Sequence, residues 1–257
     1  MPGASLSRFL DALAFFTCLV PARMCSGSAL PSLLPWFGPA GLVLGLACTG
    51  AAALLSLHLA GSAVPALLQA MLAGFAWLAA EMLLSRALHW DGLCDVADAL
   101  GSFRTGDAFW EVMKDSRIGA FGACALAAVF AGQLLAASAH AASGDWPVLL
   151  LAPAWARCQA GLLFCLAAPR DPASLGGRFA AGAAARPRNL ALLQLAAMAL
   201  CLPACGLSWR CVAAVCLAQG LITVWTAHTA RGRGGVNGDF AGCSIELSQL
   251  AFLLACC

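Results

Sequence analysis

The stretch AFGACALAAVFAGQLLAASAHAA, Ala120–Ala142, contains no Asp, Glu, Lys or Arg. A helix of roughly 17–25 mostly apolar residues is long enough to cross the hydrocarbon core of a bilayer. This stretch therefore predicts a transmembrane helix. The composition of the whole chain agrees, because 62% of its 257 residues are hydrophobic and only 10% are charged. Soluble domains carry about 25% charged residues, so the chain is predicted to be a membrane protein.

Similar apolar stretches lie on both sides of this one. The last of them, Ile245–Cys257, is short for a full crossing, and Leu6–Val20 has Asp11 in its apolar run, which favours an interfacial or re-entrant helix. We expect an all-α polytopic membrane bundle of about seven spans, preceded by an N-terminal amphipathic helix and forming one domain over residues 1–257. The other expected spans are Pro39–Leu59, Val64–Leu84, Val148–Ala168, Leu190–Leu207 and Cys211–Thr229.

Basic residues mark alternate connections between these spans, and only Arg210 departs from the pattern. Loops rich in Lys and Arg remain on the cytoplasmic side of a membrane. The long loops after the second, fourth and sixth spans are therefore predicted to face the cytoplasm. Their basic residues are Arg104, Lys114 and Arg117; Arg170, Arg178, Arg186 and Arg188; and Arg231 and Arg233.

Two features exclude other classes of protein. A net charge of +2 gives no electrostatic basis for binding nucleic acid. The 14 cysteines lie mostly inside apolar runs, with no CxxC pair and no zinc-ligand spacing. We expect them to be small buried hydrophobic residues.

The acidic residues are concentrated just before the quoted span. The stretch HWDGLCDVADALGSFRTGDAFWEVMKDSR, His89–Arg117, holds six of the twelve Asp and Glu residues. Its first three, Asp91, Asp95 and Asp98, are four and three residues apart, so they share one face of a helix. The other faces are mostly apolar, which is the reverse of a surface helix. We expect these carboxylates to line a cavity.

A second acidic run follows at Asp107, Glu111 and Asp115, again four residues apart. Carboxylates without His or Cys partners suit a hard cation, and Mg²⁺ is the usual ion where phosphates complete the coordination. The two runs together predict a Mg²⁺ site. The alternative is a solvated helix with ordinary salt bridges to Lys114 and Arg117.

The glycine-rich segment RGRGGVNGDFAG, Arg231–Gly242, follows the sixth span and is expected on the same membrane face as the acidic stretch. It contains Gly238 and Asp239. Glycines allow backbone N–H groups to approach a phosphate closely, so the segment is a candidate phosphate-binding loop. The alternative is a flexible turn between two spans.

Arg157 lies midway along the predicted span Val148–Ala168. A cation at this depth costs about 3 kcal/mol, so it needs a partner. That partner is either a substrate phosphate or a carboxylate such as Glu81 or Glu246. His89 is a candidate base, ligand or helix cap, with a packed core histidine as the alternative.

Three segments together resemble the adenosylcobalamin (cobalamin 5′-phosphate) synthase family, membrane enzymes also named adenosylcobinamide-GDP ribazoletransferases. They are HWDGLCDVADAL (89–100), FWEVMKDSRIGAFG (109–122) and GGVNGDFAGCSIELSQLAFLL (234–254). The resemblance covers nearly the whole chain. It departs from the family at Ala99, where glycine is usual, and at Phe240, where threonine is common, but no carboxylate is lost.

The resemblance implies a phosphotransferase of the bacterial cytoplasmic (inner) membrane with a cytoplasmic active site. It would transfer the phospho-corrinoid moiety of adenosylcobinamide-GDP to α-ribazole or α-ribazole 5′-phosphate and release GMP, in the last steps of cobamide nucleotide-loop assembly. It implies Mg²⁺ as the cofactor. Further partners would be the lipid bilayer and either other cobamide-assembly enzymes or a second copy of the chain.

The resemblance also implies roles for individual residues. The metal ligands would be Asp91, Asp95, Asp98, Glu111 and Asp115. The catalytic group would be Asp91, Asp95, His89 and Asp239, and substrate would be bound by Arg117, Arg157, Arg104 and Gly238.

Two other functions remain open from the residues. A CDP-alcohol-type membrane phosphotransferase would use similar carboxylates but would release CMP. A non-catalytic divalent-cation carrier would place its acids along the depth of the membrane, whereas here they cluster near one face.

Overall fold

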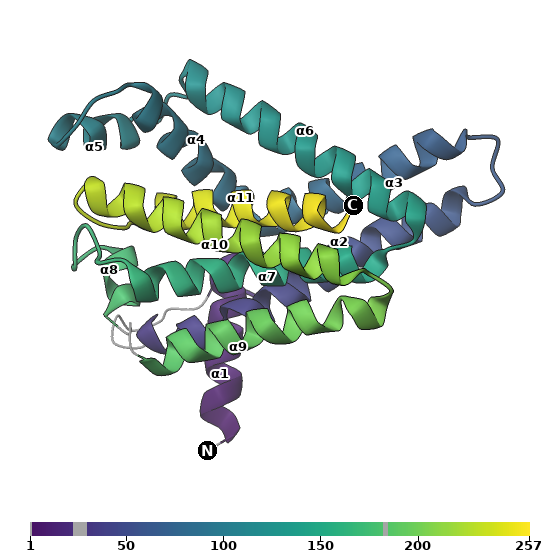
Figure 1. The fold of residues 1–257 in the computed structure, drawn as a ribbon, viewed down its shortest axis with the longest axis horizontal. Coiled ribbons are helices and arrows are strands. Elements are labelled where there is room, and N and C mark those ends of the chain that lie inside the picture. The colour runs from purple at the N-terminus through teal and green to yellow at the C-terminus, as the bar shows by residue number, and fades with distance from the viewer. Residues whose placement is uncertain (1, 23–29, 182–184) are drawn as a thin grey trace.

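A computed structural model describes residues 2–22, 30–181 and 185–257, and in these ranges the chain is helical with no β-strand (Figure 1). The helices and 3₁₀ turns are α1 Pro2–Phe16, η1 Leu30–Trp36, α2 Phe37–Leu59, α3 Ala66–Ser85, α4 Leu88–Gly101, α5 Asp107–Met113, α6 Ala120–Ser143, α7 Trp146–Leu166, α8 Leu175–Ala180, α9 Ala185–Cys201, η2 Pro203–Cys205, α10 Trp209–Gly232 and α11 Gly238–Cys256.

Seven helical segments in the described ranges are long and apolar enough to cross a membrane. They are α2 with the preceding η1, α3, α6, α7, α9 extended to Cys205, α10 and α11. Such helices satisfy every interior backbone N–H and C=O within one segment, as the lipid phase requires. The predicted all-α polytopic bundle with an N-terminal helix is confirmed.

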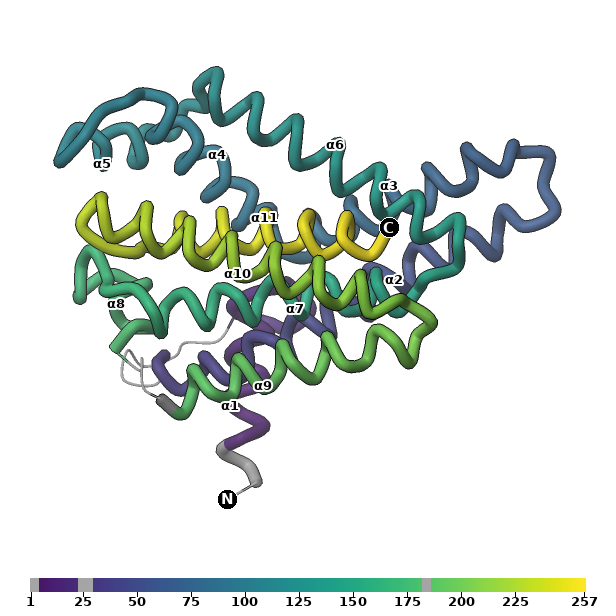
Figure 2. Tube along the Cα trace, in the orientation of Figure 1, coloured from purple at the N-terminus to yellow at the C-terminus, as the bar shows by residue number. Residues whose placement is uncertain are grey.

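Helices α7 and α11 form the centre of the bundle (Figure 2). Most of their residues are buried, whereas fewer than half of the residues are buried in each of the other candidate spans. The outer helices present leucines outward, as at Leu54, Leu83, Leu193 and Leu217. An apolar outer surface is what lipid contact favours. The buried polar residues of α7 and α11 are therefore the ones that indicate where a functional site lies.

The last span is longer than the sequence indicated. The expected start at Ile245 is wrong, because α11 begins at Gly238. The side-chain oxygen of Asn237 accepts a hydrogen bond from the backbone N–H of Phe240 at 3.0 Å, and so caps the helix. Asparagine is among the best residues at this position. The expected glycine-rich loop is therefore reduced to residues 233–237, and Asp239 lies in the first turn of a helix.

The acidic stretch and the short α10–α11 connection lie at the same end of the bundle (Figure 1). The indole N–H of Trp110 donates to the carbonyl of Arg233 at 2.9 Å, and the Arg233 guanidinium donates to the carbonyl of Arg104 at 2.9 Å. Backbone hydrogen bonds also join Val236 to Ala168 and Arg170. The predicted meeting of these two segments is confirmed, while the membrane face on which they lie stays a prediction.

Candidate functional site

A tight reversal between α3 and α4 sets the position of the acidic helix. Arg86 and Ala87 both have left-handed backbone conformations, with φ of 58° and 51°. Non-glycine residues rarely adopt this conformation, so surrounding contacts must hold it. The Arg86 guanidinium donates to the carbonyls of Ala14 and Phe15 at the end of α1, at 3.2 and 3.3 Å. Helix α1 therefore fixes the turn from which α4 begins.

Helix α4 then packs closely against the start of α11. A Cβ atom added at Gly92 would lie 2.8–2.9 Å from the backbone of Asp239, so only glycine allows this approach. The contact places Asp91, on α4, beside Asp239, on α11. Both residues, with Gly238, border the same cavity. Four sequence-predicted site residues thus meet there, the fourth being His89.

The carboxylates at this end influence one another electrostatically. Burial, together with the charges of Asp91, Asp239 and Asp98, raises the pKa of Asp95 to about 7. No arginine or lysine in the described ranges forms an ion pair with Asp91, Asp95 or Asp239. Asp239 accepts a hydrogen bond only from the Asn237 side chain, at 2.6 Å. The group therefore carries negative charge without a protein counter-ion.

Asp98 has a structural partner. Its two oxygens accept hydrogen bonds from the backbone N–H groups of Gly119 and Gly122, at 2.7 and 2.8 Å. These N–H groups belong to the first turn of α6, where a carboxylate also interacts favourably with the helix dipole. Asp98 therefore joins α4 to α6. Its predicted role as a metal ligand is left as a prediction.

The second acidic run is more exposed. Asp115 forms a bidentate ion pair with Arg117 at 2.7 and 2.9 Å, and these hydrogen bonds lower the pKa of Asp115 to about 2. Glu111 is exposed on α5. Neither Glu111 nor Asp115 is among the charges that shift Asp95. The structure gathers Asp91 and Asp95 of α4 with Asp239, and the predicted role of Glu111 and Asp115 as metal ligands stays a prediction.

Arg157 is fully buried at the centre of the bundle. Its guanidinium pairs with the carboxylate of Glu81 at 2.5 Å and donates to the side-chain oxygen of Gln249 at 3.0 Å. The second oxygen of Glu81 accepts from the indole N–H of Trp90 at 3.2 Å. The Glu81 partner considered from the sequence is thus present. The predicted contact of Arg157 with substrate remains untested.

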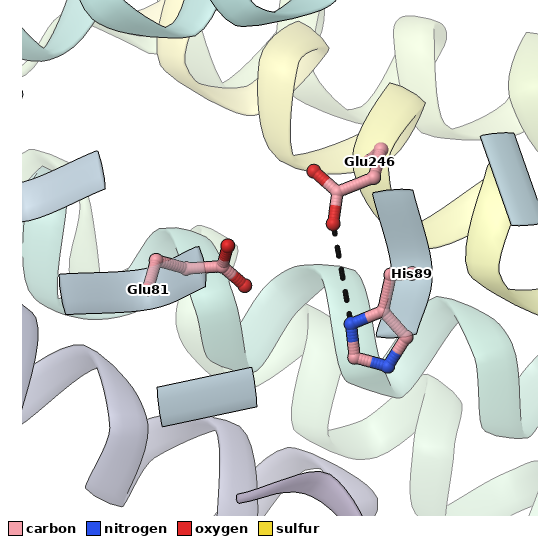
Figure 3. A group of neighbouring side chains, drawn as sticks. All are labelled: Glu81, His89 and Glu246. Atoms are coloured by element: carbon pink, nitrogen blue, oxygen red, sulfur yellow. Dashed lines mark ion pairs between the residues drawn. The ribbon is translucent and has the colours of Figure 1, made fainter. Parts of the chain in front are cut away.

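His89 and Glu246 complete this buried polar group (Figure 3). Nδ1 of His89 lies 3.4 Å from Nη2 of Arg157 and 4.0 Å from Oε1 of Glu246. The other Glu246 oxygen accepts from Gln133 at 2.9 Å. Burial and the Arg157 charge hold the pKa of His89 well below its usual range, so the ring is neutral at pH 7.

Three buried atoms of this group lack hydrogen-bond partners in the described structure: Nε2 of His89, Oε1 of Glu246 and Nε of Arg157. Glu81, His89 and Glu246 are also the one set of three metal-type ligands found in the described ranges whose donor atoms lie within 4.8 Å of one another. One arginine faces two carboxylates here, so the group has capacity for a proton or a small cation. The donor atoms of the α4 aspartates do not form a set of three within this distance of one another.

A cavity of about 240 Å³ lies beside the carboxylates. Its polar border is formed by His89, Asp91 and Asp239, and much of its remaining wall is phenylalanine. Leu88 and Leu175, which are 47% and 52% exposed, also line it. It is therefore an apolar chamber with a charged edge.

Sequence reasoning missed several of these residues. The NGD sequence was a usable signal for Asn237 as a helix cap, because asparagine favours that position. No local signal marked Gln133 and Gln249, which bond to each other at 2.8 Å and complete the buried group. The phenylalanines of the cavity come from four helices and look like ordinary core residues in the sequence.

Comparison with known proteins identifies the family of the chain. The family model for cobalamin-5-phosphate synthase matches residues 8–257. A protein named adenosylcobinamide-GDP ribazoletransferase from Nitratidesulfovibrio vulgaris (strain DP4) is 37% identical, over 97% of each chain. Proteins with the same name are 34% identical in Syntrophobacter fumaroxidans, over 97% of each chain, and 33% identical in Klebsiella pneumoniae, over 97% of this chain and 99% of the relative.

No solved structure significantly matches the chain. The family match nevertheless spans the α4 aspartates, the buried arginine and Asp239, as well as all seven candidate spans. This chain belongs to the cobalamin-5-phosphate synthase family.

Proposed function

We propose that this protein transfers the phospho-corrinoid moiety of adenosylcobinamide-GDP to α-ribazole or α-ribazole 5′-phosphate. A hydroxyl oxygen of the acceptor attacks the phosphorus next to the corrinoid, the bond from that phosphorus to GMP breaks, and GMP leaves. The observation that carries the proposal is the group Asp91, Asp95 and Asp239, brought together from two distant segments, with Asp91 and Asp239 at the edge of a cavity. The names of the full-length relatives supply the substrates.

The donor chemistry of this group fits Mg²⁺. Its ligands are carboxylate oxygens with no histidine or cysteine, and no arginine or lysine in the described ranges neutralises them. Three neighbouring anions at the edge of a membrane protein repel one another, and a divalent cation relieves that repulsion. Asp91, Asp95 and Asp239 would hold the ion. When bound, it would neutralise the diphosphate and stabilise the departing GMP.

Other residues would act on the substrate directly. The backbone N–H groups at the start of α11, beginning with Gly238, point out of a helix N-terminus, which favours phosphate. The exposed arginines Arg104 and Arg117 lie in the connections on either side of α5 and would attract the nucleotide. A carboxylate of the Asp91, Asp95 and Asp239 group would accept the proton of the attacking hydroxyl.

The location follows from the same reasoning. We place the chain in the bacterial inner membrane with the carboxylates at the cytoplasmic face, because the basic connections lie at that end of the bundle. A nucleotide-activated substrate would then reach the site from the cytoplasm.

The decisive experiment measures GMP release by the purified protein from adenosylcobinamide-GDP and α-ribazole, with and without Mg²⁺. We expect turnover only with the metal, and its loss by at least about 1,000-fold in Asp91→Ala and Asp95→Ala, the order of a lost electrostatic stabiliser. Asp107→Ala is the matched control, because this carboxylate is 94% exposed at the same end of the molecule.

Three results would contradict the proposal. Release of CMP from a CDP-lipid would indicate the lipid-synthase alternative. Metal-dependent uptake into proteoliposomes without turnover would indicate a carrier. Near-normal turnover in both aspartate variants would remove the assigned metal site.

A further inference from the structure

The cavity beside the carboxylates is lined by residues of six helices, many of them far apart in the sequence. Phe16 ends α1, Phe37 begins α2, Ala160 and Phe164 lie on α7, and Phe179 lies on α8. These five side chains are each at most 4% exposed. The inner wall is therefore apolar and shielded, while α4 and α11 supply the polar edge.

Four phenylalanines of the cavity wall pack against one another. Phe16 and Phe37 meet edge to face at 4.6 Å between ring centroids, and Phe37 meets Phe179 edge to face at 5.4 Å. Phe164 and Phe179 are nearly parallel, at 29° and 5.7 Å. Rings in such arrangements present both faces and edges to a guest, which is how proteins hold planar aromatic groups.

His89 lines the cavity and has one buried ring nitrogen without a hydrogen-bond partner among the described residues. Nδ1 of His89 faces the Arg157 guanidinium, which can only donate, so Nδ1 acts as the acceptor. The ring proton is then on Nε2, on the opposite edge of the ring (Figure 3). This Nε2 is buried and has no partner in the described structure, although His89 lines the cavity. A ligand carrying one acceptor nitrogen would satisfy it.

We propose that this cavity binds the bicyclic aromatic base of the acceptor nucleoside, with the unsubstituted ring nitrogen of the base accepting a hydrogen bond from Nε2 of His89. The inference rests on the proposed function and adds a place for the second substrate. The acceptor ribose would then lie at the edge of the cavity, beside Asp91 and Asp239, where its hydroxyl group meets the diphosphate.

Size and polarity exclude the other parts of the substrates. A cavity of about 240 Å³ is smaller than a typical pocket for a whole drug-sized ligand, so it accepts one ring system and not a corrinoid. Guanine carries several donors and acceptors that a wall of phenylalanines would leave unpaired, at a cost in binding. The base of α-ribazole is a dimethylbenzimidazole. Because one of its nitrogens is bonded to the ribose, it has one acceptor nitrogen and otherwise apolar edges, which match the lining.

The test fills part of the cavity with a larger side chain at Ala160. In Ala160→Leu we expect the KM for α-ribazole to rise at least about tenfold, because the larger side chain occupies the space of the base. The KM for adenosylcobinamide-GDP should stay within about twofold. The matched control is Ala196→Leu, which places the same side chain in a separate cavity between α7, α9 and α10 and should change neither KM.

A selectivity measurement separates binding of the base from a general loss of structure. Ala160→Leu should favour a benzimidazole riboside without ring methyl groups over α-ribazole, by roughly tenfold in the ratio of kcat/KM values. Phe164→Leu, which widens the cavity, should shift that ratio in the opposite direction. This second variant also decides the question if Ala160→Leu does not fold.

Two outcomes would overturn the inference. One is a rise in KM for adenosylcobinamide-GDP alone, which would show that the cavity binds this substrate and not the acceptor. The other is an unchanged preference between the two ribosides in both variants. Failure of the proposed function is distinct, because the wild-type protein would then release no GMP from adenosylcobinamide-GDP with either acceptor.

Discussion

Three aspartates on one face of α4 have different surroundings, although the sequence presents them as equivalent. Asp91 is exposed at the cavity edge, Asp95 is partly buried among other carboxylates, and Asp98 is bonded to the first turn of α6. Their contributions to activity and stability should therefore differ. The next two predictions use this difference.

Asp98 should contribute to stability through its two backbone hydrogen bonds. In Asp98→Asn one oxygen becomes an NH₂ group facing a backbone N–H, so one bond is lost and the helix-dipole interaction is weakened. We expect a loss of about 1–3 kcal/mol, measured as a lower midpoint of unfolding in detergent. Asp107→Asn serves as an exposed control and should change stability by less than about 1 kcal/mol. Unchanged stability with complete loss of turnover would show that Asp98 is instead a metal ligand.

Asp95 should make the Mg²⁺-free protein less stable as the pH rises. Its pKa is about 7 in the folded protein and 3.8 in its ordinary state, so the folded form binds more protons between these values. Stability then decreases from about pH 4 to about pH 7 and changes no further from this group. Thermal unfolding across this range should show the decrease. Asp95→Asn should flatten the profile, and a wild-type profile that rises between pH 4 and 7 would contradict the assignment.

At the scale of elements, the site depends on how closely α4 approaches α11. The α4 carboxylates and Asp239 are more than 140 residues apart in the sequence, and they meet because Gly92 has no side chain at the helix contact. The buried ion pair of Arg157 and Glu81 also fixes a contact between two helices, α7 and α3. Breaking a buried pair of this kind typically costs about 3–5 kcal/mol, so it helps to fix the positions of the helices.

Gly92→Ala should separate α4 from α11 and lower turnover. The new Cβ would lie 2.8–2.9 Å from Asp239 backbone atoms, which must move. A displacement of about 1 Å at a reacting centre can cost roughly 100-fold in rate, and we expect a loss of that order in kcat. The control is Gly50→Ala on α2, where an added Cβ meets nothing within 4 Å. This control should keep its activity and gain about 0.5–1 kcal/mol in stability. Full activity in Gly92→Ala would show that the close approach is not required.

At the scale of the whole molecule, the connections between helices lie at two opposite ends of the bundle. The α4–α5, α7–α9 and α10–α11 connections lie at one end and the short turns at the other (Figure 1). Because α11 begins beside the carboxylates, its C-terminal end points away from them. The orientation of the molecule in the membrane thus decides which compartment reaches the site.

Reporter fusions test that orientation. Alkaline phosphatase joined after Cys257 should be active, because it would lie outside the cytoplasm, and a green fluorescent protein joined there should be dark. Fusions made after Arg233, at the end of α10, should give the reverse pair of signals. An active phosphatase after Arg233 with an inactive one after Cys257 would place the carboxylates outside the cell.

The sequence by itself determined the class of the molecule and predicted the location of its candidate site. Charge-free runs such as Ala120–Ala142 predict spans because a bilayer penalises charge over a fixed length. The four-and-three spacing of Asp91, Asp95 and Asp98 predicts a shared face because helical geometry is local. The need of Arg157 for a carboxylate follows from the cost of burying a charge, and Glu81 meets that need.

Only the tertiary structure decided which groups meet. Asp98 bonds to residues more than 20 positions away, Asp115 pairs with Arg117, and phenylalanines from four helices line one cavity. Spacing along a helix reports neighbours within one or two turns. Contacts between helices depend on crossing positions, and these are set by packing over the whole bundle, as at Gly92 against Asp239. The sequence therefore names the reactive groups, and the packing of α4 against α11 decides which of them can act together.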